Sequence, residues 1–361
     1  MFSTPLSASA QSAYAELLEV TRHQELARSV EHLSGSFNKK MVKGATYWYY
    51  QFRDSAGGST RQIFVGRDSD KLRALVDKAR TKDTSQLDAL ARSAMALGCA
   101  ATTPAHFRIV RRLNEIGFFR AGGVLVGAHA FLAYGNALGA AWGDLARTQD
   151  LDFAHAGKNI ELALPTTLMI DTRDAITSLE AGMLPVPGFR PWDKTASFVS
   201  KVDKQLRVDF FAPMVGGKAE VFEHAGLGVN LQPMRFLEFV LEDFDQAVII
   251  SAVGAVIVNV PDPARFALHK ILVFVERRTR NPQKARKDLR QAAALIEVLS
   301  EFRLDDLVAL WKEILDRGPG WVQRARKGLV ALEELAPSLR TLQPMKKALV
   351  APRKPKRSPA R

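Results

Sequence analysis

The chain has 361 residues, of which 47% are hydrophobic and 25% are charged, and its formal net charge is +13. This composition is that of a globular protein large enough for two or three domains. No run of eighteen apolar residues occurs, and the N-terminal stretch has no basic segment followed by an apolar core, so we expect neither a transmembrane helix nor a secretory signal. The single cysteine, Cys99, excludes an intramolecular disulfide and a cysteine-based zinc site, and it fits a reducing cytoplasm, the compartment we expect.

The positive charge is concentrated in two segments. Residues 39–80 contain ten lysines and arginines against four aspartates, and residues 345–361 contain seven basic residues and no acid. Together these segments account for the whole excess of positive charge. A localised basic surface favours a polyanionic partner bound through its phosphates. For the C-terminal segment alone, a solubilising tail is an equally simple interpretation.

The first part of the chain predicts a helix followed by a small sheet. Apolar residues recur every three or four positions over residues 8–34, as in an amphipathic helix. The stretches "TYWYYQFRD" and "RQIFVG" alternate as strands on either side of the turn "SAGGST", which predicts a hairpin. A further helix is expected at about residues 68–82.

Aromatic and basic side chains are interleaved around this hairpin. The basic residues are Lys39, Lys40, Lys43, Arg53, Arg61 and Arg67, and the aromatic ones are Tyr47, Trp48, Tyr49 and Tyr50. Aromatic rings can stack on bases while the charges follow the phosphates, so the pattern suits a nucleic acid. The segment also resembles, over some 40 residues, the small sheet-plus-helix modules at the arms of tyrosine recombinases. The simpler interpretation is that one face packs its aromatic rings against the flanking helices, and the two interpretations are compatible.

The middle of the chain alternates helices and strands. In chain order, we predict a helical region at 84–120, a buried strand at 123–127, a helix at 128–139, a strand at 147–154 and a helix near 166–181. The stretches "SFVSKV" and "QLRVDFFAP" then predict a second hairpin. Beyond about residue 230 the pattern is mostly helical, with one strand pair within "AVIISAVGAVIVNVP".

Three aspartates within predicted strands are the first candidates for chemistry. Asp150 and Asp152 are two positions apart in one strand, so their side chains lie on the same face. Two adjacent carboxylates repel unless a cation accompanies them, and Mg²⁺ favours a few carboxylates together with phosphate oxygens and water. Asp209 on another strand would complete a site for in-line phosphoryl chemistry. A half-exposed strand with acidic residues on its solvent-facing side would have the same sequence. The Asp150 and Asp152 pair alone therefore does not distinguish a metal site from an exposed strand face.

A glycine turn precedes these acids. In "VLVGAHAF" a strand runs into a helix through Gly127, and backbone amides at a helix start form an anion site that glycine lets a phosphate approach closely. His129 on the first turn of this helix has two interpretations, a contact to the bound anion or a buried, hydrogen-bonded histidine.

These elements in this order resemble a known superfamily. The series "VLVGAHAF…ARTQDLDFA…LRVDFF" resembles the nucleotidyltransferase-fold, DNA polymerase β-like superfamily. The resemblance is closest to bacterial nucleotidyltransferase-like proteins, including abortive-infection and toxin-type members, that combine a glycine turn with R-x-T-x-D-x-D. That signature stands here as Arg147, Thr148, Asp150 and Asp152, and the resemblance covers about residues 105–300.

The resemblance implies a fold and a set of roles. It implies an α+β fold with a mixed sheet flanked by helices. Asp150, Asp152 and Asp209 would be the catalytic and metal-binding residues, with the first two carrying the nucleoside triphosphate (NTP) on Mg²⁺ or Mn²⁺ and the third activating the attacking group. The nucleotide would also be bound by Gly127, Ala128, His129, Arg147 and Thr148. The superfamily usually has Gly-Ser or Gly-Gly at the turn, whereas this chain has Gly127-Ala128 and lacks the hydroxyl contact.

A second matching segment lies downstream. In "DPARFALHKILVFVERR" and the following "KARKDL", Lys270, Lys287 and Asp288 match a lysine and a later Lys-Asp pair of the toxin-type families, which implies contacts to the triphosphate. Asp288 could instead pair with Lys270 as a structural tie, because lysine is rarely buried unpaired. The many lysines and arginines between residues 277 and 290 form either a solvated face or a surface for a polynucleotide acceptor.

The sequence pattern and the resemblance together predict that the chain is divided into four parts. They are an N-terminal helix with the basic aromatic hairpin (1–83), the nucleotidyltransferase core (84–230), a mostly helical domain that completes the site (231–344) and a disordered basic tail (345–361).

The leading functional hypothesis is a Mg²⁺-dependent transfer of a nucleoside monophosphate (NMP) from an NTP to a nucleic acid. RNA, for example a tRNA 3′ end, is preferred over DNA, with contacts through residues 39–80 and the tail and no membrane partner. One alternative is an inactive nucleotidyltransferase fold that binds or regulates nucleic acid, and another is nucleotidylation of a protein or small molecule. A cognate antitoxin or partner protein is implied by family analogy only.

Overall fold

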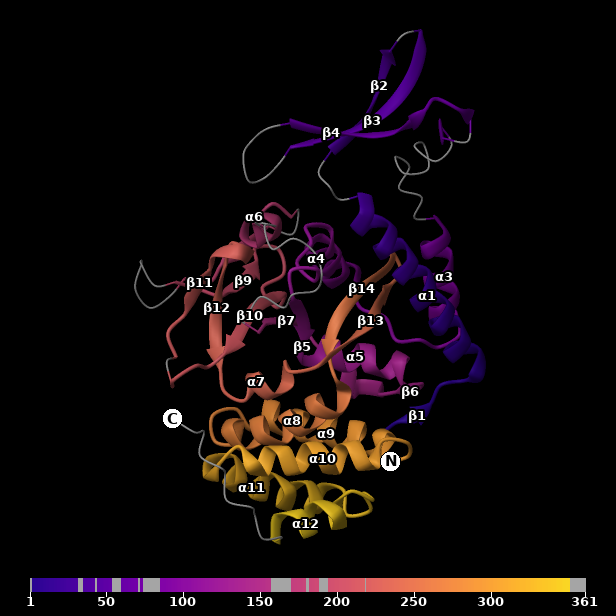
Figure 1. Cartoon of the computed structure of the whole chain (residues 1–361). Coiled ribbons are helices and arrows are strands. Elements are labelled where there is room, and N and C mark those ends of the chain that lie inside the picture. The colour runs from indigo at the N-terminus through magenta and orange to yellow at the C-terminus, as the bar shows by residue number, and fades with distance from the viewer. Residues whose placement is uncertain are drawn as a thin grey trace, which may run out of the picture.

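The fold is α+β, as the sequence predicts (Figure 1). The computed structural model describes residues 2–31, 35–42, 44–53, 60–70, 72–73, 85–156, 170–179, 182–187, 194–217 and 219–350. Within these residues a mixed central sheet is covered by helices on one side and closed at one end by a stack of C-terminal helices.

The central sheet has the strand order β11 (Phe222–His224), β12 (Val229–Met234), β10 (Arg207–Pro213), β7 (Asp150–His155) and β5 (Gly123–Val126). β10 is parallel to β7 and β12, whereas β5 is antiparallel to β7. β9 (Ser197–Ser200) pairs antiparallel with the first half of β10, and β8 (Met183–Pro185) pairs with β9. The predicted strands at 123–127 and 147–154 and the second hairpin are therefore confirmed.

Along β7 and β10, side chains that point into the core alternate with side chains that point to the opposite face of the sheet. Leu151, Phe153, Val208 and Phe210 are fully buried in the main core, which is why these strands hold their register. The intervening aspartates consequently point to the opposite face of the sheet.

A strand pair and four helices cover the rest of the core. They are β13 (Phe244–Ser251), β14 (Gly254–Pro261), α1 (Ala8–Glu31), α3 (Ser85–Ala96), α4 (Pro104–Glu115) and α5 (Gly127–Ala137). Leu17 of α1 and Ala91 of α3 pack with Val248 of β13 in one apolar cluster. The first helix therefore packs into the core, and the predicted unit 1–83 is wrong in that respect. Short elements are β1 (Thr4–Pro5), β6 (Ala140–Ala141), α6 (Thr172–Thr177) and α7 (Leu237–Val240).

The C-terminal part is a helix stack, at the bottom in Figure 1. It consists of α8 (Pro263–Arg277), α9 (Pro282–Leu299), α10 (Leu304–Asp316), α11 (Pro319–Leu335) and α12 (Leu342–Val350). Proline at the first helical position and the capping side chains of Asp262 and Asn281 fix the starts of α8 and α9. The basic tail was predicted to begin at residue 345, but Met345 and Ala348 are buried in α12, so the prediction is wrong for residues 345–350. Residues 351–361 lie outside the described residues.

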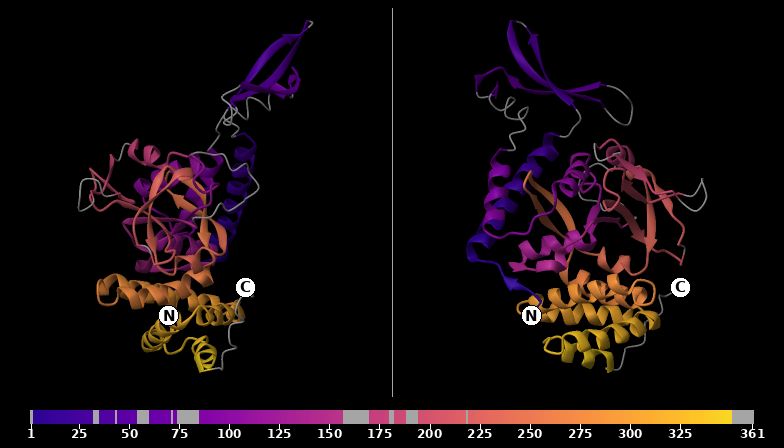
Figure 2. Two further views of the ribbon diagram at one scale, coloured as in Figure 1. Left: turned by 60° about the vertical axis from the view of Figure 1, so that its left-hand side comes forward. Right: turned by 180° about the vertical axis from the view of Figure 1, so that it is seen from behind.

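A small antiparallel sheet stands apart from this body in every view (Figures 1 and 2). It contains β2 (Gly35–Val42), β3 (Ala45–Arg53) and β4 (Thr60–Arg67), so the predicted hairpin is confirmed and gains a third strand. Most of the helix expected at 68–82 lies outside the described residues. No helix in the described part of the chain is long and apolar enough to cross a membrane.

Candidate active site

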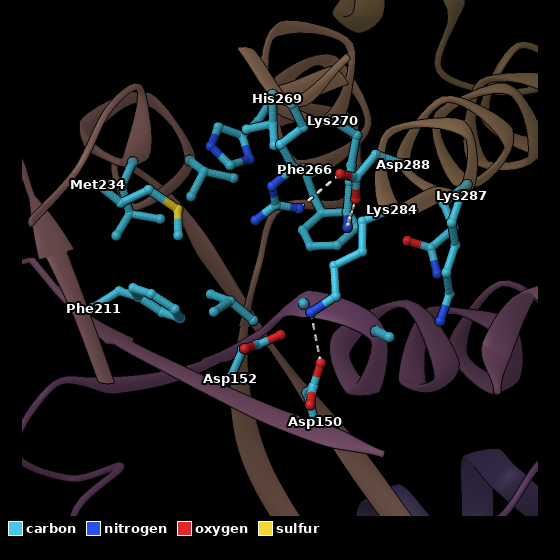
Figure 3. Close-up of a pocket in the computed structure, with 18 of the residues that line it drawn as sticks. Asp150, Asp152, Phe211, Met234, Phe266, His269, Lys270, Lys284, Lys287 and Asp288 are labelled. Carbon is cyan, nitrogen blue, oxygen red and sulfur yellow. Dashed lines mark hydrogen bonds and ion pairs between the residues drawn. The ribbon is translucent and has the colours of Figure 1, made fainter. Parts of the chain in front are cut away.

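A pocket lies where the central sheet meets α8 and α9 (Figure 3). It contains about 920 Å³ of atom-free space, counting its open mouth. Its floor comes from β5, β7 and β10, and its opposite wall comes from the two helices. The charged side chains that line it are Asp150, Asp152, Asp209, Lys270, Arg277, Lys284, Lys287 and Asp288.

The structure brings all three predicted aspartates to this pocket. β7 and β10 run parallel with Asp152 directly beside Asp209, so the three carboxylates share one face of the sheet. Asp150 Oδ2 is 2.9 Å from Lys284 Nζ. Asp209 is held by Arg207, whose Nε lies 2.9 Å from both carboxylate oxygens, and by the hydroxyl of Ser197.

Asp152 has no such partner among the described residues, and the pKa of its carboxyl group is raised. Burial, together with the charges of Asp209 and Asp150, raises the pKa of Asp152 to about 6. No three acidic, histidine or cysteine side chains of the described residues are arranged to hold a metal ion. Because Arg207 forms an ion pair with Asp209, the three aspartates do not together form a metal site in this arrangement. Lys284 likewise pairs with Asp150, so of the three aspartates Asp152 is the one without an ion pair in the described part of the chain.

Gly127 begins α5 directly against Asp152. Its φ of +68° lies in the left-handed region, where other residues are strained. A Cβ at this position would stand 2.0 Å from Asp152 Oδ2, far inside contact distance. Both the backbone conformation and the space therefore require glycine here. The backbone of Gly127 and Ala128 lines the pocket at a helix start, where amide groups favour an anion.

The helix wall contains a buried ion cluster. Lys270 Nζ of α8 lies 2.6 Å from Asp288 Oδ1 of α9, and Arg277 donates to the other oxygen of Asp288 at 2.7 Å. Burial raises the pKa of Asp288, but the charges of Lys270 and Arg277 outweigh it and leave the pKa below its usual value. The structural tie between Lys270 and Asp288, left open by the sequence, is thus formed, although both residues still line the pocket.

Lys284 and Lys287 extend from α9 over the pocket mouth. Lys284 reaches Asp150, and Lys287 donates to the backbone carbonyl of Arg147. Burial, followed by the charge of Lys270, lowers the pKa of Lys287. Lys284 was not singled out from the sequence. Its spacing of three and four residues from Lys287 and Asp288, which puts all three on one helix face, is the pattern that could have identified it.

Two predicted nucleotide-binding residues lie elsewhere. Arg147 is exposed, pairs with Asp144 at 3.1 Å and does not line the pocket, whereas its neighbour Thr148 does. His129 is buried behind the strand and is absent from the lining, so the anion contact predicted for it is not supported.

The surroundings of His129 explain its burial. Its Nδ1 lies 3.1 Å from the carbonyl oxygen of Asp150, and its Nε2 lies 2.9 Å from Thr102 Oγ1 and 3.2 Å from His106 Nδ1. Burial and His106 lower the pKa of His129 to about 3, so the ring is neutral. His129 therefore fixes the backbone that carries Asp150, the second of the two interpretations above.

Comparison with known proteins gives one match. A family model described as "Nucleotidyltransferase" matches residues 105–316, more than half of the chain, and includes every residue of the pocket. Searches of curated proteins and of solved structures returned no match.

Proposed function

Because the chain belongs to this nucleotidyltransferase family and is a transferase, we propose that the pocket binds an NTP with Mg²⁺ and transfers its NMP to an RNA acceptor. The observation that carries the proposal is the juxtaposition of Asp150 and Asp152 with the glycine turn at Gly127. A metal-bound triphosphate needs carboxylates and backbone amides side by side, and these are adjacent here.

The residues present fit a divalent cation. Three carboxylates share the floor, and Asp152 beside Gly127 has no ion pair among the described residues. Asp150 and Asp152 would hold Mg²⁺, or Mn²⁺, and the ion would neutralise charge on the phosphate being transferred.

The other groups have separate roles in this proposal. The amides of Gly127 and Ala128 bind the β and γ phosphates, and Lys284 and Lys287 at the mouth add positive charge for the same phosphates. Binding of the triphosphate exchanges the Lys284–Asp150 contact for a lysine–phosphate contact. Lys270, held by Asp288, acts mainly by fixing α8 against α9.

The reaction joins the acceptor oxygen to the α-phosphorus of the NTP. The bond from that phosphorus to the bridging oxygen breaks, pyrophosphate leaves, and the acceptor hydroxyl loses its proton. Asp209 is the candidate to accept this proton, because it adjoins Asp152 on the next strand. It would first have to exchange its contact with Arg207 for one with the acceptor.

The separate β2–β4 sheet supports a nucleic-acid acceptor. Trp48 is buried on one face of it and donates to Asp68 at 2.7 Å, which accounts for one of the aromatic residues as core. On the other face, the rings of Tyr47 and Tyr49 lie 5.8 and 5.7 Å from that of Phe64, which is 59% exposed.

Basic groups surround these rings. Lys40 Nζ lies 5.3 Å from the centre of the Tyr49 ring, and Arg67 is paired with Tyr47 across the strands. An aromatic face that is partly exposed and has basic groups beside it suits stacking on the bases of a single strand. The side chains of Lys43, Arg53 and Arg61 and the basic tail lie outside the described residues.

The test is transfer of label from each of the four α-labelled NTPs to total cellular RNA in the presence of Mg²⁺. The proposal predicts labelled RNA with the wild-type protein and none with Asp150→Asn/Asp152→Asn. Arg147→Gln is the matched control, because it changes an exposed residue beside the site and should retain transfer.

The other outcomes separate the alternatives. RNA that shifts on a gel but is never labelled, with any NTP, would support an inactive fold that binds nucleic acid. Label on protein or on an added small hydroxyl compound, but not on RNA, would retain the enzyme and overturn the acceptor.

A further inference from the structure

α8, α9 and α11 pack together in the stack of C-terminal helices (Figure 1), and a second cavity lies between them. It contains about 1070 Å³ of atom-free space, counting its open side, and is larger than the active-site pocket. Its buried lining residues form an apolar floor, and three arginines line its exposed rim, Arg278, Arg286 and Arg290. We name this cavity the helix groove. The chemistry described above gives it no role.

α9 separates the helix groove from the active-site pocket. Lys284 and Asp288 of this helix line the pocket, whereas Arg286 and Leu289 line the groove. With 3.6 residues in each turn of a helix, these two pairs lie on opposite faces. An α-helix with its side chains is about 10–12 Å across. A polymer whose end lies in the pocket therefore reaches the groove within a few of its own units.

The turn from α8 to α9 joins the two cavities. Arg277 lines the pocket, and the next residue, Arg278, lines the groove. Arg280 in the same turn is exposed. A polyanion that leaves the pocket over this turn therefore passes the positive charges of Arg278 and Arg280 before it enters the groove.

The three arginines of the helix groove have no counter-charge among the described residues. None of them forms an ion pair or a side-chain hydrogen bond there, and of those residues Glu334 is the one acid in the lining. Arg277, by contrast, donates to Asp288. An arginine without a carboxylate partner offers its whole fork of N–H donors to a phosphate. The groove therefore suits a ligand with several negative charges.

The apolar floor narrows the class of this ligand. Phe274 and Leu289 are buried beneath the groove, and Leu335 at its edge is exposed. The unpaired bases of a single-stranded RNA can lie on such a floor while its phosphates contact the arginines, whereas a duplex keeps its bases stacked inside. Arg286 and Arg290 are separated by about 6 Å along α9, a step comparable to that between successive phosphates of an extended strand.

The C-terminal end of the chain does not complement this groove. Residues 351–361 contain five lysines and arginines and no acid. Their charge has the same sign as that of the groove, so the two repel each other. Charge complementarity therefore points to an external polyanion as the occupant.

We propose that the helix groove binds the single-stranded segment that precedes the 3′ end of the RNA acceptor. Its phosphates contact Arg278, Arg286 and Arg290, and its bases lie on the apolar floor. The strand passes over the turn between α8 and α9, and its 3′ end enters the active-site pocket. This inference rests on the proposed nucleotidyl transfer. It gives the acceptor a contact beside the pocket, in addition to the β2–β4 sheet that stands apart from the body.

The test compares a short and a long acceptor with the same 3′ sequence. One oligoribonucleotide has about three nucleotides and cannot pass around α9, and the other has about sixteen. Transfer from each α-labelled NTP is measured with the full chain and Mg²⁺. Binding of both RNAs is measured by fluorescence anisotropy over a range of salt concentrations. The variant Arg278→Gln/Arg286→Gln/Arg290→Gln removes the three charges of the groove.

The glutamine variant should raise KM for the long acceptor by about tenfold to a hundredfold and leave its kcat unchanged. Transfer to the short acceptor should not change. The slope of log binding constant against log salt concentration should fall by about two for the long RNA, because each phosphate contact of a single strand contributes about 0.7. Arg278→Lys/Arg286→Lys/Arg290→Lys keeps the charges and should retain most of that slope.

A matched control changes the net charge equally outside the groove. Lys312→Gln/Arg326→Gln/Arg340→Gln alters three exposed side chains of the same helix stack that do not line the groove. This variant should bind and modify the long RNA as the wild-type protein does. Melting temperatures of all variants verify that they are folded.

The outcomes distinguish this inference from the proposed function. An unchanged KM for the long acceptor in the glutamine variant would overturn the inference, and so would an equal rise in the matched control. If the glutamine variant loses binding of a helical peptide with acidic residues on one face and leucines on the other, while RNA binding is unchanged, the groove docks a protein and the inference is wrong. Absence of transfer to either acceptor by the wild-type protein would instead show that the proposed function is wrong, and the salt dependence of RNA binding would still test the groove.

Discussion

Asp152 on the sheet and Asp288 on α9 line opposite walls of the same pocket, and their surroundings shift their pKa values in opposite directions. Burial raises the pKa of Asp152 to about 6, with neighbouring carboxylates adding to the effect. Asp288 is also buried, but Lys270 and Arg277 donate to its two oxygens and leave its pKa below the usual value. Each oxygen of Asp288 thus has a cationic partner, whereas Asp152 has no ion pair among the described residues, although its neighbours Asp209 and Asp150 pair with Arg207 and Lys284.

This difference in charge compensation indicates different roles for the two walls of the pocket. A compensated buried cluster contributes mainly to holding α8 on α9, because removal of one member leaves an unpaired buried charge. A buried carboxylate without a counter-charge raises the free energy of the empty site, and a bound cation lowers that free energy most. In the function proposed above, the metal and the nucleotide therefore bind at the sheet wall, and the helix wall gives structural support.

The largest expected effect is on catalysis at the sheet wall. Asp150→Asn/Asp152→Asn should reduce transfer by about 10³-fold or more, because the negative charge that would hold the cation is lost. The fold should remain, since neither carboxylate supports the core. Labelled-NTP assays measure the first effect and thermal melting the second. Retention of more than a tenth of the activity would contradict the assignment.

A change at the helix wall should instead affect stability. Asp288→Asn leaves Lys270 buried without its counter-charge, and we expect a loss of about 3–5 kcal/mol in the free energy of unfolding. Lys194→Met breaks the exposed pair with Glu223 and should cost less than about 1 kcal/mol. Urea denaturation measures both. Equal losses of unfolding free energy in the two variants would show that the buried cluster stabilises the fold no more than an exposed ion pair does.

The pH dependence of stability sharpens the contrast. The pKa of Asp152 is raised in the folded protein, so the folded state binds its proton more tightly than the unfolded state does. The stability that this proton gives is present at about pH 4 and is lost as pH rises through about 6. Asp152→Asn should therefore be more stable than wild type by roughly 2–3 kcal/mol at pH 7, and by little at pH 4. Parallel stability curves from pH 4 to 7 would contradict this.

The smallest effect is expected at the β2–β4 sheet. Tyr49→Ala/Phe64→Ala should weaken binding of single-stranded RNA by about 1–3 kcal/mol per lost stacked base. Phe302→Ala is a matched control, because Phe302 is also 59% exposed but lies in the helix stack. Fluorescence anisotropy with a labelled oligoribonucleotide measures both. If the two variants bind alike, the sheet is not the acceptor surface.

The sequence predicted the sheet wall better than the helix wall. Asp150, Asp152 and Asp209 could be predicted because strand periodicity fixes which side chains share a face, and the turn at Gly127 is local in sequence. Lys284 could not, because its role depends on how α9 docks on the sheet, a long-range contact that no local pattern encodes. His129 illustrates the opposite error, since a polar residue beside a site in sequence can support it from behind.

The fate of both ends of one nucleotide tests the central claim most directly. The protein is incubated with Mg²⁺, RNA and an NTP labelled separately at the α and γ phosphates. We expect the α label to join the RNA and the γ label to appear as pyrophosphate, one for each nucleotide transferred. Transfer of the γ label to the acceptor, or release of pyrophosphate without any α label on an acceptor, would contradict it.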